Sequence, residues 1–293
     1  MLCVALRMVA SGSKSRATRA ARVVLSCTGV RNASLKVVND MQEQATGALP
    51  EGAPSELRER GPGWGWGDLL MALVVTVVGG VALTLAARSL VDRLGLQVEQ
   101  RMISPVFYLV GLGIYLAVIL GVYLFAARRT GWAALGLRGA GWRNFALVPP
   151  LFILELLLLV LVNGAVGQLA GGFENPQVDA LTGGQTLATG ELLALLLLVA
   201  VVAPFAEELL FRGMLYPLLR ARTGAFGAIV LSAAIFAAAH VVPLLMPGLF
   251  VVGLLLAYLR ERSGSIWPGV ALHALQNGTA LLLINEALKQ GLV

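Results

Sequence analysis

The sequence predicts an all-α fold, a polytopic transmembrane helix bundle of about seven spans, with six to eight as the range. Hydrophobic residues make up 58% of the 293 residues, charged residues only 13%, and the mean hydropathy is +0.82. Soluble domains carry roughly a quarter charged residues. Long apolar segments account for the difference, and inside a bilayer such segments satisfy their backbone groups as helices. These observations exclude a soluble enzyme, a disordered chain and a disulfide-rich scaffold.

Seven apolar segments support this count, because most approach the roughly 20 residues that a helix needs to cross a bilayer. They are residues 69–87, 106–127, 145–169, 191–219, 224–242, 246–260 and 266–284. The sixth is short enough to be re-entrant. Tryptophans fall near segment ends, as expected for rings anchored at the headgroup level; they are Trp64, Trp66, Trp132, Trp142 and Trp267. Residues 68–288 are therefore predicted to form one transmembrane domain.

Basic residues in the loops predict the orientation. Residues 128–144 carry four arginines and no acid, whereas residues 171–190 carry two acids and no base. The positive-inside rule then gives an integral, multi-pass protein of a bacterial-type cell membrane with a cytoplasmic N-terminus. One loop opposes this assignment, because Arg88, Arg93 and Arg101 would lie outside.

Residues 1–67 are predicted to be a basic, flexible extension. Residues 1–39 hold seven of the 22 basic residues and no acid, which leaves fifteen basic residues against 16 acidic ones in the rest of the chain. The bundle is therefore about neutral, and nucleic acid is not expected as a partner. The composition is typical of a transit peptide, although a translation start at Met41 or a dispensable tail explains it more simply. Both cysteines, Cys3 and Cys27, lie here, so cysteine chemistry is unavailable to the bundle.

Ionisable side chains inside apolar helices indicate function, because each costs about 2.5 to 3.5 kcal/mol on insertion scales. Such residues concentrate in the last third of the chain. The fourth segment contains APFAEELLFRG, the fifth ends in FAAAHVVP and the seventh contains HALQN. The candidate site residues in these motifs are Glu207, Glu208, Arg212, Phe236, His240, His273 and Asn277. The two histidines are the only ones in the chain, and random core polarity explains them poorly beside an apolar Glu–Glu pair.

Helical spacing allows these residues to meet. Glu208 and Arg212 share a face at i, i+4, while Glu207 is turned about 100° away toward another neighbour. Glu207 precedes the predicted turn at Thr223 by 16 residues, and His240 follows it by 17. In an antiparallel hairpin both residues would lie roughly 25 Å from the turn, and therefore level with each other.

The chemistry available to this set is water activation. A carboxylate in an apolar site, coupled to a neutral imidazole, is a competent general base, and a second imidazole with an amide can donate hydrogen bonds to an oxyanion. Hydrolysis of an amide fits these groups. Glu207, His240 and His273 could instead hold Zn²⁺ with an open position for water. The HExxH and GxSG motifs of other intramembrane proteases do not occur.

The three motifs, in this order on three helices, are EExxxR, FxxxH and HxxxN. Over about residues 190–285, they resemble the CPBP intramembrane protease family. That family includes the type II CAAX prenyl endopeptidases and bacterial members linked to bacteriocin processing and self-immunity.

The resemblance implies roles for the candidate residues. These are water activation by Glu207 and His240, oxyanion stabilisation by His273 and Asn277, and support of the site by Glu208 and Arg212. Phe236 is expected to pack beside His240 at i, i+4. Both a metal-dependent and a metal-free glutamate mechanism are attributed to the family, so zinc stays an open alternative.

The sequence therefore predicts an intramembrane endopeptidase that acts on a peptide or membrane-protein substrate, lipidated ones included. The alternative is a transporter or scaffold that uses the same buried polar cluster without proteolysis. Structural explanations also exist, because Glu208 and Arg212 can form a buried ion pair and each histidine can form an interhelical hydrogen bond. The small-residue helix faces serve internal packing as well as self-association, so no oligomeric state is predicted.

Overall fold

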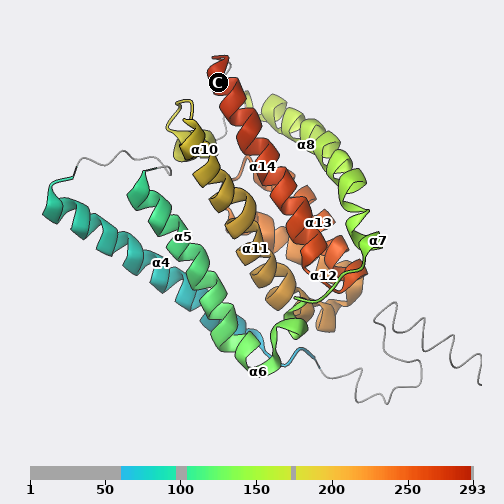
Figure 1. Cartoon of the computed structure of the whole chain (residues 1–293). Coiled ribbons are helices and arrows are strands. Elements are labelled where there is room, and N and C mark those ends of the chain that lie inside the picture. The colour runs from blue at the N-terminus through green and yellow to red at the C-terminus, as the bar shows by residue number, and fades with distance from the viewer. Residues whose placement is uncertain (1–60, 97–103, 173–175, 292–293) are drawn as a thin grey trace, which may run out of the picture. The chain divides into compact units, whose positions relative to one another are not determined.

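The computed structural model describes residues 61–96, 104–172 and 176–291, and all regular secondary structure in these ranges is helical (Figure 1). The ranges belong to one compact unit, Arg60–Val293. The predicted all-α fold is thus confirmed for the described residues. Of the predicted N-terminal extension, only residues 61–67 fall within these ranges, so its character stays a prediction.

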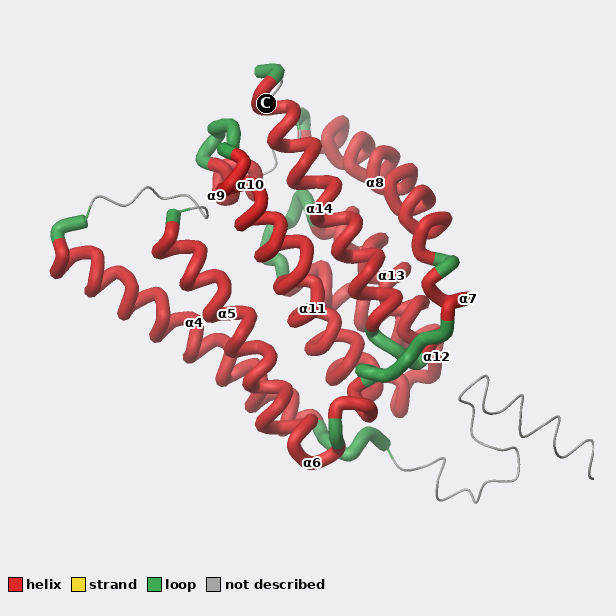
Figure 2. The backbone as a smooth tube through the Cα atoms, in the orientation of Figure 1, coloured by secondary structure: helices red, strands yellow, loops and turns green. Residues whose placement is uncertain are grey.

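Two long helices, α4 and α5, form the first hairpin and pack side by side (Figures 1 and 2). The hairpin comprises α4 Trp66–Leu94, α5 Pro105–Val122, a π-helical turn Tyr123–Ala127 and α6 Arg128–Thr130. The first turn of α4 is capped, because the backbone N–H of Gly65 donates a hydrogen bond to Oδ2 of Asp68 at 2.9 Å. Ser104 accepts from the backbone of Phe107 and Pro105 occupies the first helical position, which fixes the start of α5.

The middle of the chain contributes one long helix and several short ones. They are a 3₁₀ turn Trp132–Leu135, α7 Trp142–Phe145, α8 Val148–Ala170 and α9 Pro176–Thr182. The loop before α7 is bonded to the turn before the last helix. The backbone N–H of Ile266 donates to the carbonyl of Gly136 at 3.0 Å, and the Ser265 hydroxyl donates to the carbonyl of Arg138 at 2.7 Å.

The remaining helices contain the candidate site residues, except His240, which directly follows α12. They are α10 Thr189–Leu196, a π-helical turn Leu197–Val202, α11 Ala203–Glu208, a second π-helical turn Leu209–Leu215, α12 Tyr216–Ala239, α13 Met246–Ser263 and α14 Trp267–Lys289. Figure 2 shows α10 and α11 as successive parts of one helical rod beside α14. Gly224 interrupts α12 with a φ of 72°, next to the predicted turn at Thr223. The two π-helical turns flank α11. Such π-bulges often occur at functional sites.

Four helical runs are long and apolar enough to cross a membrane. They are Trp66–Leu94, Pro105–Thr130, Trp142–Ala170 and Thr189–Ala239. The predicted count of seven spans is not confirmed. The fourth and fifth predicted segments fall in one 51-residue run, Thr189–Ala239. The last two segments carry more polar residues, since α13 ends in Arg260, Glu261 and Arg262 and α14 contains His273 and Asn277.

Candidate active site

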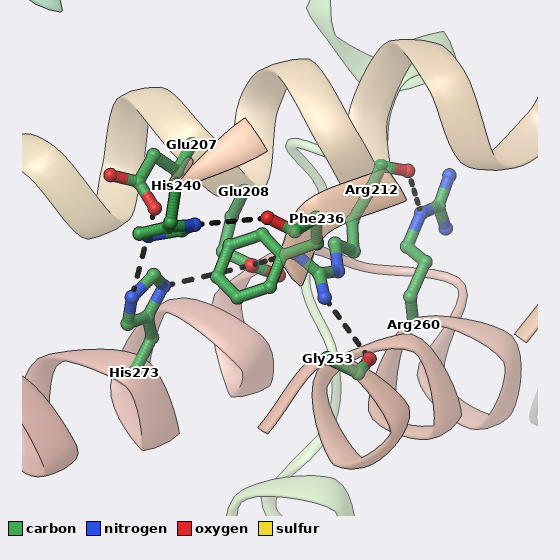
Figure 3. Close-up of polar contacts among 8 residues, drawn as sticks. All are labelled: Glu207, Glu208, Arg212, Phe236, His240, Gly253, Arg260 and His273. Carbon is green, nitrogen blue, oxygen red and sulfur yellow. Dashed lines mark hydrogen bonds and ion pairs between the residues drawn. The ribbon is translucent and has the colours of Figure 1, made fainter. Parts of the chain in front are cut away.

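Three helices bring the motif residues together (Figure 3). Glu207 and Glu208 are the last two residues of α11. Phe236 lies in the last turn of α12, and His240 directly follows the end of that helix. His273 lies on α14. Helix α11 packs against α14, and α12 packs against the π-helical turn that follows Glu208. Residues far apart in the sequence therefore share one polar cluster inside the helical unit.

A fully buried ion pair forms one side of the cluster. Nη1 of Arg212 lies 3.0 Å from Oε1 of Glu208, and the two side chains are 0% and 1% exposed. Nη2 of Arg212 donates a hydrogen bond to the carbonyl of Gly253 on α13 at 3.0 Å, and Nε of Arg260 donates to the carbonyl of Arg212 at 2.9 Å. The i, i+4 spacing thus produces the expected shared face, and the pair also ties α13 to the site.

His273 lies between the two carboxylates. Its Nε2 is 3.8 Å from Oε2 of Glu207, and its Nδ1 is 3.7 Å from Oε1 of Glu208. These separations exceed normal hydrogen-bond lengths, and catalytic contacts are commonly this long before substrate binds. Glu207 keeps 19% of its side chain exposed, whereas Glu208 is enclosed. The two adjacent glutamates therefore occupy different environments, because only the Glu207 side chain stays partly exposed.

The ring of Phe236 contacts both histidines and Arg212. It makes edge-to-face contacts with the imidazoles of His240 and His273, with centroid separations of 4.9 and 5.7 Å, and the Arg212 guanidinium lies 4.5 Å from its centroid. Phe236 is completely buried. The aromatic ring thus fixes the relative positions of both histidines and the arginine.

His240 faces the cluster from the end of α12, with Nδ1 2.9 Å from the carbonyl oxygen of Phe236. A carbonyl only accepts, so Nδ1 carries the proton in this contact, and Nε2 of the neutral ring retains its lone pair. Among the described residues, no hydrogen bond or ion pair joins His240 to Glu207. The described ion pair of Glu207 is with His273.

Asn277 lies one turn beyond His273 on α14. Its Nδ2 donates a hydrogen bond to the carbonyl of Val199 at 2.8 Å. That carbonyl belongs to the π-helical turn before α11, where the regular helical pattern changes. Asn277 thus connects α14 to the helix of Glu207, and the described contacts do not join it directly to the histidines.

Two further residues border the site, and the sequence motifs did not point to them. Glu155 of α8 is fully buried, neither of its carboxylate oxygens has a hydrogen-bond partner among the described residues, and it interacts electrostatically with His273. Tyr115 of α5 places its hydroxyl against the Glu207 carboxylate. Glu155 carried a signal, because it is the only acid in the apolar segment 145–169. A single tyrosine in an apolar helix gives no sequence signal of a functional site, because tyrosine is common there.

The candidate zinc ligands do not form a ligand set. Within the described ranges, no group of three histidine, cysteine or acidic residues is arranged to hold a metal ion. Zinc requires ligand atoms that converge at about 2.0 to 2.2 Å from one point. The geometry of these three residues therefore does not fit the ion.

The fold and the site together define a helical membrane protein with a buried glutamate–histidine cluster. Residues 189–279, which include every motif residue, match the family model described as Type II CAAX prenyl endopeptidase Rce1-like. The match agrees with the resemblance that the three motifs indicate. No curated protein and no solved structure matched the chain.

Proposed function

We propose that this protein is an intramembrane endopeptidase that hydrolyses a peptide bond at or within the membrane, with Glu207 as the general base. The observation that carries the proposal is the position of His273 between the carboxylates of Glu207 and Glu208. It is supported by the family match over residues 189–279.

Water activation is assigned to Glu207 and His240. The Glu207 carboxylate takes one proton from the water molecule. The unprotonated Nε2 of His240 accepts a hydrogen bond from the second O–H group of that water and so orients the water oxygen. The water oxygen then attacks the carbonyl carbon of the peptide bond. The partial exposure of Glu207 supports this role, because a water molecule can reach its side chain beside His273.

Oxyanion stabilisation is assigned to His273 and Asn277. An imidazole between two carboxylates can present an N–H group on either nitrogen, and the Asn277 amide has a second N–H besides the one donated to Val199. Both groups can donate to the negatively charged oxygen of the tetrahedral intermediate. Glu207 then returns its proton to the amide nitrogen, the C–N bond breaks, and a carboxylate and an amine are released.

Peptides that carry a lipidated cysteine near their C-terminus are one proposed substrate class. The name of the matching family describes prenyl CAAX substrates, and the site lies among membrane-spanning helices where a lipid chain is soluble. Unlipidated membrane-proximal peptides form the second class to test. The same cleavage chemistry serves both classes.

The test uses the full chain, purified and reconstituted in nanodiscs, with paired peptide sets that differ only in the lipid. Wild type is compared with Glu207→Gln and His240→Ala. Glu286→Gln is the matched control, because Glu286 is an exposed glutamate near the end of α14. Loss of a general base costs about 10²- to 10⁴-fold in rate, so both site variants should lose measurable cleavage while the control retains it.

Unchanged cleavage in Glu207→Gln would refute the assignment of the base. The transporter or scaffold interpretation makes a different prediction, because no peptide would be cut by any variant. Transport of protons or cations into sealed vesicles would then depend on Glu207.

A further inference from the structure

An open groove runs along the α4–α5 hairpin and includes none of the site residues. It is lined by α4 from Thr76 to Arg88 and by Ile114 of α5, and its volume is about 420 Å³. We refer to it as the α4–α5 groove. Only 17% of the most apolar stretch of α4 is buried. The groove therefore lies on a helix whose surface faces the surrounding bilayer.

The lining of the groove suits a hydrocarbon chain. Its apolar side chains are Val77, Val81, Leu85 and Ile114. The hydroxyls of Thr76 and Thr84 donate to the carbonyls of Ala72 and Gly80 in their own helix, at 3.0 and 2.8 Å. These donors are therefore satisfied, and the groove wall presents mainly methyl and methylene groups.

The groove follows about 18 Å of α4, from Thr76 to Arg88, which is close to the roughly 15 Å of one leaflet's hydrocarbon. Arg88 follows Trp66 by 22 residues, or about 33 Å of helix, and the hydrocarbon core is about 30 Å thick. With Trp66 at one headgroup level, Arg88 reaches the other. Thr76 lies about 15 Å from Trp66 and is thus near the midplane. The groove accordingly extends from the bilayer centre to the headgroups.

The charge at the end of the groove identifies the occupant. Arg88 is exposed, and among the described residues it has no ion-pair partner. A guanidinium binds phosphate oxygens through paired hydrogen bonds. We propose that the α4–α5 groove binds one anionic phospholipid, with an acyl chain along α4 and the headgroup phosphate on Arg88. This contact also gives a reason for Arg88, one of the three arginines that oppose the positive-inside assignment.

The test measures which lipid stays bound to the full chain. Protein is purified in mild detergent, incubated with equal amounts of phosphatidylglycerol and phosphatidylcholine of identical acyl chains, and examined by native mass spectrometry. Wild type is compared with Arg88→Ala and with Arg93→Ala, a matched change on the same helix outside the groove lining. Val81→Trp fills the groove without changing its charge.

Wild type should retain one phospholipid and prefer phosphatidylglycerol. Arg88→Ala should reduce the preference about fivefold, the effect of one basic residue near an anionic surface, while Arg93→Ala keeps it. Val81→Trp should reduce retention of both lipids. Equal losses in the two arginine variants would overturn the proposal, as would unchanged retention in Val81→Trp. Thermal unfolding of each variant identifies loss of fold, and a variant with a lowered midpoint is replaced by Arg88→Gln or Val81→Phe.

Discussion

The α4–α5 hairpin and the helical run Thr189–Ala239 are both strongly apolar, but they bury different shares of their surface. In their most apolar stretches, 17% of α4 is buried against 39% of the longer run. Their ion pairs differ in the same way. The Arg129–Asp68 pair of the hairpin is 48% and 25% exposed, whereas the Arg212–Glu208 pair is almost completely enclosed. The comparison teaches that the polar site depends on protein packing around it, and that apolar sequence alone does not distinguish a lipid-facing helix from a site helix.

The largest difference between the two regions should appear in their ion pairs. Arg212→Ala leaves Glu208 buried without its partner and removes the hydrogen bond to Gly253, so it should lower the free energy of unfolding by about 3 to 5 kcal/mol. Arg129→Ala removes an exposed pair and should cost about 0 to 1 kcal/mol. Unfolding curves in mixed micelles measure both values. Equal costs would contradict the comparison.

Glu155 should separate stability from activity. Glu155→Leu removes a buried carboxyl that has no hydrogen-bond partner, so stability should rise by about 1 to 3 kcal/mol. Cleavage should fall, because the electrostatic interaction of the Glu155 carboxyl with His273 is lost; a tenfold fall would correspond to about 1.4 kcal/mol of transition-state stabilisation. Both quantities are measured on the same preparation, with the substrate found in the peptide test.

The matched control for Glu155 is Asn163→Leu on the same helix. The side-chain oxygen of Asn163 is also buried without a partner, and it lies against the start of α13 at Gly248. This variant should gain stability without losing cleavage. If Glu155→Leu behaves in the same way, Glu155 has no influence on the reaction.

Glycine positions sharpen the comparison of packing. A Cβ on Gly253 would lie 2.8 Å from the backbone Cα of Ala233, so Gly253→Ala must push α12 and α13 apart and should cost about 1 to 3 kcal/mol. A Cβ on Gly79 would meet Ala117 at an ordinary 3.4 Å, so Gly79→Ala should change stability by less than about 1 kcal/mol. Thermal midpoints of the two variants check the ranking. A larger loss in Gly79→Ala would show that the α4–α5 hairpin is the more tightly packed region.

The sequence predicted the helical class, the turn near Gly224 and the shared face of Glu208 and Arg212, because each depends on local periodicity or spacing. It did not predict the ion pair between His273 and Glu207. The spacing from the turn concerned only the level of His240 relative to Glu207. The rotation of each helix about its axis decides such contacts, and tertiary packing sets that rotation.

Glu155 and Tyr115 fall outside the matched segment 189–279, and they reach the site only because α8 and α5 pack against it. Glu155 could have been found by treating every acid in an apolar segment as a candidate, as was done for the last third of the chain. Tyr115 could not have been found in this way, because tyrosine is a common residue in membrane helices. Its relevance depends on contact with Glu207, which spacing along one helix does not predict.

The smallest expected effect is that of a zinc chelator on cleavage. Among the described residues, Glu207, His240 and His273 are not arranged as a metal-ligand set. Millimolar 1,10-phenanthroline should therefore leave the cleavage rate unchanged, while it inhibits an HExxH zinc protease assayed in parallel. Inhibition that added Zn²⁺ reverses would contradict the glutamate mechanism. The three side chains would then have to move toward one another when the ion binds, and the exposed Glu207 has more freedom to do so than the enclosed Glu208.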